Sequence, residues 1–315
     1  MFYAGSMVKN DYLCAQIMAI NALSILIPTY NDLCVRLVDD LRQQAEAAGF
    51  DYEILVADDG STDADVIAKN SEINQWPHCH YLRQSQNIGR AAIRNHLARQ
   101  ARYDHLLFID SDMTLVRPDY LSRYVSTAGD DVIDGGVCIG GDADALKGNL
   151  RYRYEKAAEH EHTAEKRRLH PYQDFHTANF LIRRDLMLAH PFDERFCHYG
   201  YEDVLFGKQL RADRIAITHI DNPLGFCTFE PNPDFVSKTE EGLRTLCQFR
   251  HELRGYSRML TFADGIHIPP ILWIIRLSHR LFGTLIRRNL CGHHPNLRLF
   301  GLYKLGYFLT LQRYE

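Results

Sequence analysis

His105-Leu106-Leu107-Phe108-Ile109-Asp110-Ser111-Asp112 places two carboxylates, one residue apart, directly after an unbroken apolar run. Such a run is typical of a strand that is buried on both faces of a parallel sheet. The carboxyl ends of these strands form the edge where open α/β sheets bind nucleotides and metal ions. The stretch therefore predicts an α/β fold with a binding site at Asp110 and Asp112.

On either side of this motif, short β-type runs alternate with helical patterns. Strand character is found at 23–27, 52–57 and 80–82, and helical spacing at 33–48, 63–70 and 89–101. This alternation predicts a mostly parallel sheet flanked by helices. Further on, residues 215–219 predict an edge strand, and the pattern is helical from residue 235. The polar segment 149–173 predicts either a cover over the site or a solvated helix.

Length and composition limit the kinds of protein that this sequence can encode. The chain has 315 residues and is 46% hydrophobic, enough to bury a full core. Its eight cysteines are scattered without a C-x-x-C pair, which predicts reduced thiols and a cytoplasmic location. The first 22 residues lack the continuous apolar core of a signal peptide, so we expect an N-terminal extension there.

Charge and apolar spacing set the C-terminal region apart. Residues 240–315 hold eleven Lys/Arg against five Asp/Glu, although the whole chain has a net charge of -4. Apolar residues between Ile271 and Ile286 follow helical spacing, with Trp273 and several arginines among them. The pattern suits a helix on a membrane surface, and equally a helix docked on the rest of the protein. The apolar content argues against nucleic acid as the partner.

Three more turns are expected at the same sheet edge. Pro28-Thr29-Tyr30-Asn31 follows the first strand, and Asp58-Asp59-Gly60-Ser61-Thr62-Asp63 follows the second. Taken singly, each is typical of an ordinary turn. Asn87-Ile88-Gly89-Arg90-Ala91-Ala92-Ile93-Arg94-Asn95 then opens a helix with two arginines about one turn apart, which suits a diphosphate.

In this order the motifs resemble those of family 2 glycosyltransferases with the GT-A nucleotide-diphospho-sugar transferase fold. Two downstream segments add to the resemblance, Gly200-Tyr201-Glu202-Asp203 and His219-Ile220-Asp221-Asn222-Pro223. The similarity runs from about Leu23 to Lys238. It implies a catalytic domain of residues 23–238, which follows an N-terminal extension of residues 1–22. The helical region of residues 239–315 lies beyond the similarity, and its own composition gives peripheral membrane contact as one reading.

The resemblance also implies roles for individual residues. The donor nucleotide would be bound by Pro28, Tyr30, Asp58, Asp59, Arg94 and Asp110, with Asp110 reaching the ribose. Asp112 and His219 would be ligands of a divalent cation, Mn²⁺ or Mg²⁺, and an imidazole ligand would favour Mn²⁺. A UDP-linked sugar is the commonest donor in the family.

For the chemical step, the resemblance favours Asp203 as the general base and Glu202 as a hydrogen-bonding neighbour. Adjacent residues at a helix start diverge by about 100°, so only one of the two is expected to face the acceptor. The implied reaction is inverting, metal-dependent transfer of a sugar to a glycan or glycolipid in bacterial cell-surface polysaccharide assembly. The enzyme would work in the cytoplasm or on the inner face of the membrane.

Other functions remain open from the sequence. A polyprenyl-phosphate sugar transferase would use the same donor site, and the basic apolar tail suits it. Asp110-Ser111-Asp112 also resembles the nucleophile motif of haloacid-dehalogenase-like phosphatases, with Asp110 phosphorylated and Asp112 as acid/base. That motif normally opens its domain, whereas here three nucleotide-type turns precede it. A domain that binds nucleotide sugar without turnover would need a lost base or metal ligand.

Overall fold

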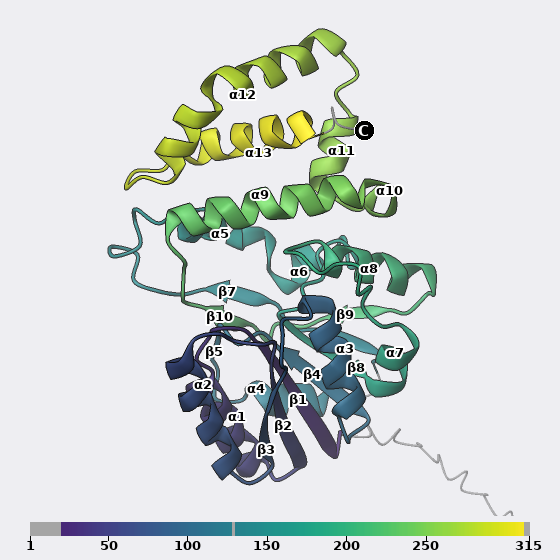
Figure 1. Ribbon diagram of the computed structural model, residues 1–315. Coiled ribbons are helices and arrows are strands. Elements are labelled where there is room, and N and C mark those ends of the chain that lie inside the picture. Colours follow the sequence, from purple (N-terminus) through teal and green to yellow (C-terminus); the bar gives the residue numbers. More distant parts are fainter. Residues whose placement is uncertain (1–19, 128–129, 312–315) are drawn as a thin grey trace, which may run out of the picture.

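The computed structural model describes residues 20–127 and 130–311 (Figure 1). Its main sheet has seven strands in the order β3-β2-β1-β4-β8-β6-β9. These strands are β3 (Cys79–Arg83), β2 (Asp51–Asp58), β1 (Ala22–Thr29), β4 (His105–Ile109), β8 (Asn179–Arg183), β6 (Val132–Asp134) and β9 (Ile217–His219). The deciding apolar run is thus β4, the central strand.

Strand direction follows the alternation seen in the sequence. β3, β2, β1 and β4 are parallel to one another, and β9 is parallel to β6. Only β8 is antiparallel to its two neighbours, β4 and β6. The predicted mostly parallel sheet is therefore confirmed, as is the edge strand that ends at His219.

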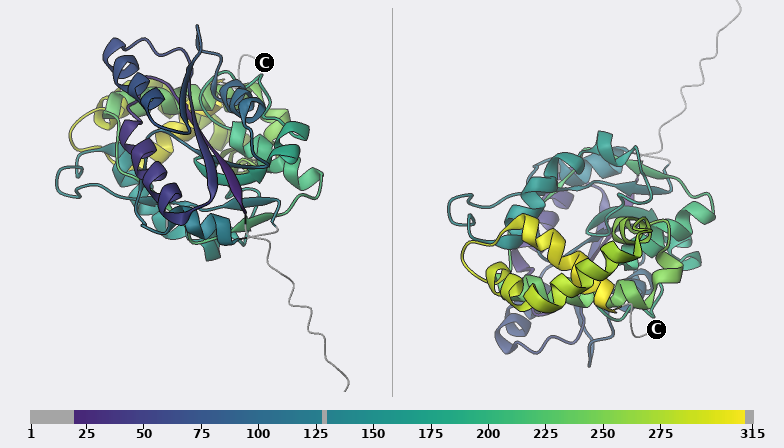
Figure 2. Two further views of the ribbon diagram at one scale, coloured as in Figure 1. Left: turned by 90° about the horizontal axis from the view of Figure 1, so that it is seen from below. Right: turned by 90° about the horizontal axis from the view of Figure 1, so that it is seen from above.

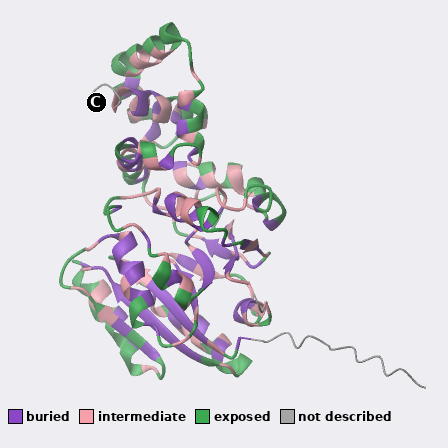
Figure 3. Ribbon diagram, turned by 90° about the vertical axis from the view of Figure 1, so that its right-hand side faces the viewer, coloured by how far each residue is buried: buried purple, intermediate pink, exposed green. Residues whose placement is uncertain are grey.

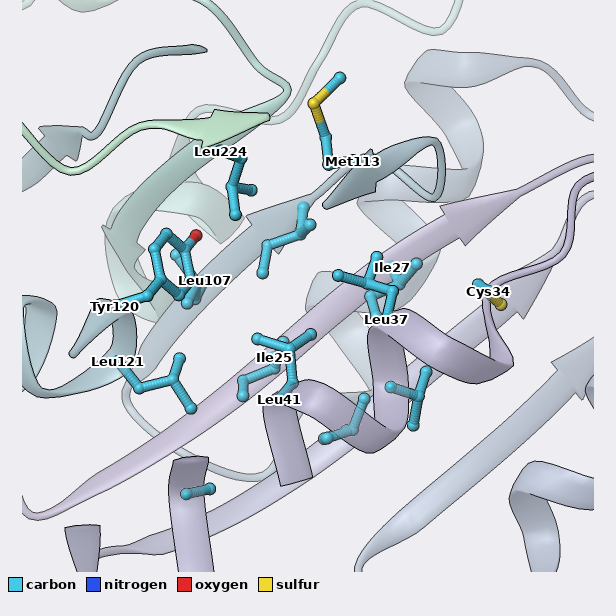
Figure 4. Packing of buried hydrophobic residues seen from close by; sticks show 14 of the residues in the cluster. Ile25, Ile27, Cys34, Leu37, Leu41, Leu107, Met113, Tyr120, Leu121 and Leu224 are labelled. Atoms are coloured by element: carbon cyan, nitrogen blue, oxygen red, sulfur yellow. The ribbon is translucent and has the colours of Figure 1, made fainter. Parts of the chain in front are cut away.

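Helices cover both faces of this sheet. On one face, Leu37 and Leu41 of α1 (Val35–Ala48) and Leu121 of α4 (Tyr120–Ser126) pack on Ile25 and Leu107 (Figure 4). The opposite face carries α3 (Arg90–Gln100), α7 (Arg184–Ala189) and α8 (Glu202–Ala212), which pack around stacked phenylalanines of β4 and β8. Two further elements, α2 (Ala64–Ser71) and the 3₁₀ helix η1 (Glu72–Gln75), link β2 to β3.

A second, three-stranded sheet lies beyond the first. The apolar run from Val132 to Ile139 breaks at Gly135-Gly136, where Gly136 has a φ of 80°, and continues as β7 (Val137–Ile139). β7 pairs with β10 (Leu224–Phe226), which also pairs with β5 (Met113–Leu115). Because β5 begins at the residue after Asp112, the Asp110-Ser111-Asp112 turn is held between the two sheets.

Most of the remaining helices form a stack on the side of the second sheet, whereas the short helix at Ala164–Arg167 packs on β9 of the main sheet. The remaining helices are α5 (Leu150–Ala158), η2 (Glu159–Glu161), α6 (Ala164–Arg167), α9 (Asn232–Gln248), α10 (Arg250–Leu253), α11 (Arg258–Asp264), α12 (Pro269–Leu290) and α13 (Leu297–Leu311). α13 packs on α9, and α12 packs on α13 as the outermost layer (Figures 1 and 2). The predicted helical C-terminal region is present, and the expected boundary after Lys238 falls inside α9.

The structure describes only a small part of the expected N-terminal extension. Most of the expected N-terminal extension, residues 1–19, lies outside the described residues; Ile20 is buried, and its backbone N–H donates to the carbonyl of Val125. Within the described part of the chain, we find no helix with both the length and the apolar character needed to cross a membrane.

Candidate functional site

A cavity of about 910 Å³ opens at the carboxyl ends of β1, β2 and β4. Six of the residues predicted from the sequence line it, namely Pro28, Tyr30, Asp59, Arg94, Asp110 and Asp112. Side chains of α5 and α9 close it on the side of the helical stack. A hollow of about 530 Å³ between α1 and residues 115–118 contains none of these residues. The large cavity is therefore the candidate site.

The first two turns are tied to each other. The Asn31 side-chain oxygen accepts hydrogen bonds from the backbone N–H groups of Thr62 (2.8 Å) and Asp63 (2.9 Å). The Asn31 backbone N–H in turn donates to the hydroxyl of Ser61 (2.7 Å). With the two turns joined by these hydrogen bonds, Tyr30 is 48% exposed and lines the cavity. Its aromatic ring is therefore available for stacking.

Asp59 fixes the third turn. Its carboxylate accepts hydrogen bonds from the backbone N–H groups of Ile88 (2.7 Å) and Gly89 (3.0 Å), just before α3. Gly60 allows this close approach, because a Cβ there would lie 2.5 Å from the backbone carbon of Gln86 and its φ is +76°. Burial raises the pKa of Asp59, and the two N–H donors oppose the rise. Asp59 thus shapes the cavity wall as well as lining it.

Asp58, also predicted to bind the donor, faces away from the cavity. It is fully buried, and its carboxylate accepts hydrogen bonds from the Ser61 backbone N–H (2.7 Å) and the Tyr81 hydroxyl. Asp58 is the last residue of β2 and is held by these two donors, whereas Asp59 follows the strand and lines the cavity. Asp58 holds the turn and is removed from the donor-binding set.

Two arginines and two carboxylates form a cluster beneath the cavity. Arg94 is fully buried, and its guanidinium donates to Asp110 (Nη2 to Oδ1, 2.6 Å) and to Glu202 (Nη1 to Oε1, 3.4 Å). Arg90, one helical turn earlier on α3, pairs with the same two carboxylates at 3.7 and 3.2 Å. The cluster joins the start of α3, the end of β4 and the start of α8.

Replacing the buried arginine is expected to destabilise the fold. In an Arg94→Met variant, Asp110 and Glu202 lose their buried partner, so the free energy of unfolding should fall by about 3–5 kcal/mol. Urea unfolding measures the loss. Arg36→Met is the matched control, because the Arg36 side chain is 91% exposed and its removal should cost about 0.5 kcal/mol or less. Equal losses in the two variants would contradict this account of the cluster.

A group of aspartates lines the cavity beside this cluster. Burial, together with the negative charges of Asp110 and Asp32, raises the pKa of Asp112 to about 6, and Arg151 and Arg90 oppose the rise. One oxygen of Asp32 is buried without a hydrogen-bond partner. Mg²⁺ and Mn²⁺ bind carboxylate oxygens, and this group supplies several of them, one of which has no hydrogen-bond partner.

The donor set fits a cation shared with a substrate. Among residues 20–127 and 130–311, no group of three or more His, Cys, Asp or Glu side chains is placed so that it could hold a metal ion by itself. Magnesium-type sites, however, commonly use one or two carboxylates and complete their shell with waters and substrate phosphates. Asp112, with Asp110 and Asp32 nearby, therefore fits a cation that arrives with a diphosphate.

His219, predicted as a second metal ligand, lies elsewhere. It is the last residue of β9, three strands away from β4, which corresponds to about 14 Å. Its Nδ1 lies 3.1 Å from Asp134 and 2.9 Å from the Arg167 guanidinium, and its Nε2 lies 2.9 Å from the carbonyl of Pro171. With both ring nitrogens engaged and no exposed surface, His219 belongs to a buried structural network and is removed from the metal-ligand set.

The start of α8 separates its two acids. Gly200 and Tyr201 have φ values of 90° and 71°, and the left-handed conformation is strained for a tyrosine, as is often found at active sites. Glu202 turns into the arginine cluster with 4% of its side chain exposed. Neither Glu202 nor Asp203 lines the cavity directly, but Asp203 interacts electrostatically with two residues that do, His176 and Arg90.

Asp203 has a carboxyl group whose pKa lies above the usual range of an aspartate. Burial and the charge of Glu202 raise the pKa of Asp203, while His176 and Arg90 oppose the rise. Its Oδ1 accepts a hydrogen bond from the backbone N–H of Val204 (2.8 Å). The two acids thus have different environments, because Glu202 pairs with two arginines whereas burial and the charge of Glu202 raise the pKa of Asp203.

Sequence reasoning missed part of the cavity wall. Arg151 and Glu155 project into it from α5, and the Arg151 guanidinium pairs with Glu230 (2.5 Å) and lies 4.2 Å from the Phe226 ring centre. Their spacing of four residues on one helix face was the available signal. α5 belongs to the polar segment 149–173, so the part of that segment in α5 covers the site.

The sequence is similar to those of two curated enzymes. The chain is 24% identical to chondroitin synthase from Escherichia coli over 259 residues, which cover 71% of this chain and 37% of that protein. It is 29% identical to validoxylamine A glucosyltransferase from Streptomyces hygroscopicus subsp. jinggangensis over 296 residues, covering 83% and 65% respectively. The chain thus spans less than two thirds of the length of either relative.

Solved structures show weaker likeness. The crystal structure of S. aureus TarS 1-349 in complex with UDP-GlcNAc is 16% identical, with a TM-score of 0.49 over 93% of this chain and 91% of that chain. The family itself is shown by a match to a family model. The model described as "Glycosyl transferase family 2" matches residues 24–189, just over half of the chain. The match contains the four upstream motifs and the strands that carry them, and on this basis the chain belongs to glycosyl transferase family 2.

Proposed function

We propose that this glycosyltransferase catalyses inverting, metal-dependent transfer of a sugar from a nucleotide-sugar donor, most simply a UDP-sugar, to a hydroxyl group of a glycan or glycolipid. One observation carries the proposal. Tyr30, Asp59 and Asp112 line a single cavity, and two other lining residues, His176 and Arg90, connect it to the raised-pKa carboxylate of Asp203. The family match speaks against the phosphatase alternative.

On the donor side, the exposed face of Tyr30 would stack on the nucleobase, with Pro28 and Asp59 beside it. Asp110, oriented by Arg94 at 2.6 Å, would accept a hydrogen bond from the ribose. Asp112 would hold Mn²⁺ or Mg²⁺, and a bound cation of this kind stabilises the negative charge of the leaving diphosphate as a Lewis acid. Because His219 lies elsewhere, its imidazole gives no reason to favour Mn²⁺ over Mg²⁺.

On the acceptor side, Asp203 would take the proton from the attacking hydroxyl group. The acceptor oxygen forms a bond to the anomeric carbon while the bond from that carbon to the diphosphate oxygen breaks, so the configuration inverts. A carboxylate with a raised pKa is a better base near neutral pH than an ordinary aspartate. Glu202 is unsuited to this step because two arginines neutralise it, and we assign it to positioning α8.

The relatives and the cysteines suggest where the enzyme works. Relatives named chondroitin synthase and poly(ribitol-phosphate) beta-glucosyltransferase support a role in polysaccharide assembly. Six cysteines among the described residues are free thiols, which supports a cytoplasmic enzyme: Cys34, Cys79, Cys138, Cys197, Cys227 and Cys291. A polyprenyl-phosphate acceptor is a second candidate, favoured by apolar and basic side chains on α12. Comparing lipid phosphates with free oligosaccharides as acceptors separates the two.

Thermal unfolding with a panel of nucleoside diphosphates tests the donor assignment. At a hundred times its dissociation constant, the correct diphosphate with Mn²⁺ or Mg²⁺ should raise Tm by about 2–4 °C. UDP is expected to give the largest shift. Tyr30→Ala should reduce the shift without lowering the Tm of the free protein, because Tyr30 is half exposed. If no diphosphate raises Tm with either cation, the proposed donor site is wrong.

A further inference from the structure

The outermost helix, α12, presents large apolar side chains to solvent. Six of them are between 42% and 62% exposed, and we call this set the outer face of α12: Ile271, Trp273, Ile274, Leu281, Phe282 and Leu285. Figure 3 shows the exposed side of this helix at the end of the molecule farthest from the main sheet. Together these side chains form a patch on the order of several hundred Å², which in a soluble protein usually marks an interaction site.

The opposite side of α12 is already occupied. Leu272 and Ile275 pack into a buried cluster with Phe308 of α13, and Gly283 and Leu290 are buried. The Arg276 Nε also donates a hydrogen bond to the carbonyl of Leu309 (2.9 Å). The inner side of α12 is therefore docked on the rest of the protein, as one of the two expectations had it. The outer face remains available to a partner.

The charge around the outer face indicates what kind of partner fits. Residues 265–311 contain six Lys/Arg and no Asp/Glu, in a chain whose net charge is -4. Arg280 and Arg288 are exposed on α12 beside the apolar side chains. A tryptophan, several aliphatic side chains and flanking arginines are the composition of helices that lie in the interface of an anionic membrane.

We propose that the outer face of α12 binds the surface of an anionic lipid bilayer. Its apolar side chains would enter the boundary between headgroups and acyl chains, and Arg280 and Arg288 would contact lipid phosphates. A second copy of this chain fits less well, because a two-fold contact through this face would bring the arginines of both copies together without an acidic partner on α12. α13 and α9 lie between α12 and the cavity.

Co-sedimentation of the full chain with vesicles tests this proposal. The protein should pellet with vesicles that contain phosphatidylglycerol and much less with pure phosphatidylcholine, and added salt should weaken the binding. A Leu281→Gln/Leu285→Gln variant should bind about tenfold more weakly or worse. The reason is that two leucine side chains that would be partly buried in the bilayer are replaced by polar ones. The matched control is Leu169→Gln/Leu188→Gln, which changes two exposed leucines outside α12 and should pellet like the unmodified protein.

Three results would overturn the proposal: an unmodified protein that stays in the supernatant with both vesicle types, a Leu281→Gln/Leu285→Gln variant that pellets equally well, or a lipid-free dimer that the same variant dissociates in sedimentation velocity. The last result would identify a second copy as the partner. Sugar transfer to a water-soluble acceptor should be unchanged in both variants, so failure here is distinguishable from failure of the catalytic proposal.

Discussion

Asp203→Asn is expected to lower kcat by about 10²–10⁴-fold, the usual contribution of a positioned general base. The amide keeps the shape of the side chain, so the fold and the Tm shift produced by UDP with Mn²⁺ should stay close to those of the unmodified protein. The measurement is steady-state release of nucleoside diphosphate in the presence of acceptor. A large fall in kcat with little change in donor binding is the signature of a lost base.

A control on the same helix makes this result specific. Asp213→Asn changes an exposed aspartate at the C-cap of α8 and should leave kcat unchanged. Glu202→Gln should instead lower both activity and stability, because Arg94 and Arg90 lose a shared partner. An Asp203→Asn protein with near-normal kcat would remove Asp203 from the chemical step.

The pH profile gives a second readout of the same residue. Only the ionised form of Asp203 can accept a proton, and its pKa is raised, so the acid limb of kcat should lie above the ordinary range of an aspartate. Below that pKa the rate should fall about tenfold per pH unit. The surrounding groups are Glu202, His176 and Arg90, and His176→Gln should move the limb to higher pH because an interaction that lowers the pKa of Asp203 is removed. A shift to lower pH would contradict this description.

The second large effect concerns the cation. Asp112→Asn should abolish the cation-dependent part of the Tm shift caused by UDP and should lower transfer by about 10³-fold, since charge stabilisation by a bound cation is worth several kcal/mol. The free variant should be at least as stable as the unmodified protein, because one of several neighbouring negative charges is removed. Calorimetric titration of UDP with and without Mn²⁺ measures the effect.

Asp144→Asn serves as the control for this variant, since Asp144 is exposed in the segment between β7 and α5. It should bind UDP and Mn²⁺ like the unmodified protein. An Asp112→Asn variant with undiminished cation-dependent binding would place the cation, if one is used, on other residues.

The fold could be predicted because its central elements are strongly patterned. Leu106 to Ile109 are apolar on both faces and form the central strand, and the alternation around them gave the parallel sheet. The family match together with this topology confirms the predicted GT-A class with a helical extension. Gly135-Gly136 ends one strand and starts another in a second sheet, which the apolar run alone did not indicate.

A position at the end of a strand did not by itself determine which predicted residues reach the cavity. Asp110 and Asp112 line the cavity because their strand is central. His219 also ends a strand, but sequence spacing does not reveal that β8 and β6 lie between β9 and β4. Arg151 and Glu155 reach the cavity from α5, which is far along the chain from the Asp110-Ser111-Asp112 turn, so only packing brings them there.

The most direct measurement of the central claim is donor turnover by a set of variants. We predict that the unmodified protein, supplied with a UDP-sugar, a divalent cation and a glycan or lipid-linked acceptor, releases UDP, as do the Asp144→Asn and Asp213→Asn controls. Asp112→Asn and Asp203→Asn should release UDP at least about a hundredfold more slowly. Equal rates in all five proteins would contradict the assignment of this cavity as the glycosyl-transfer site.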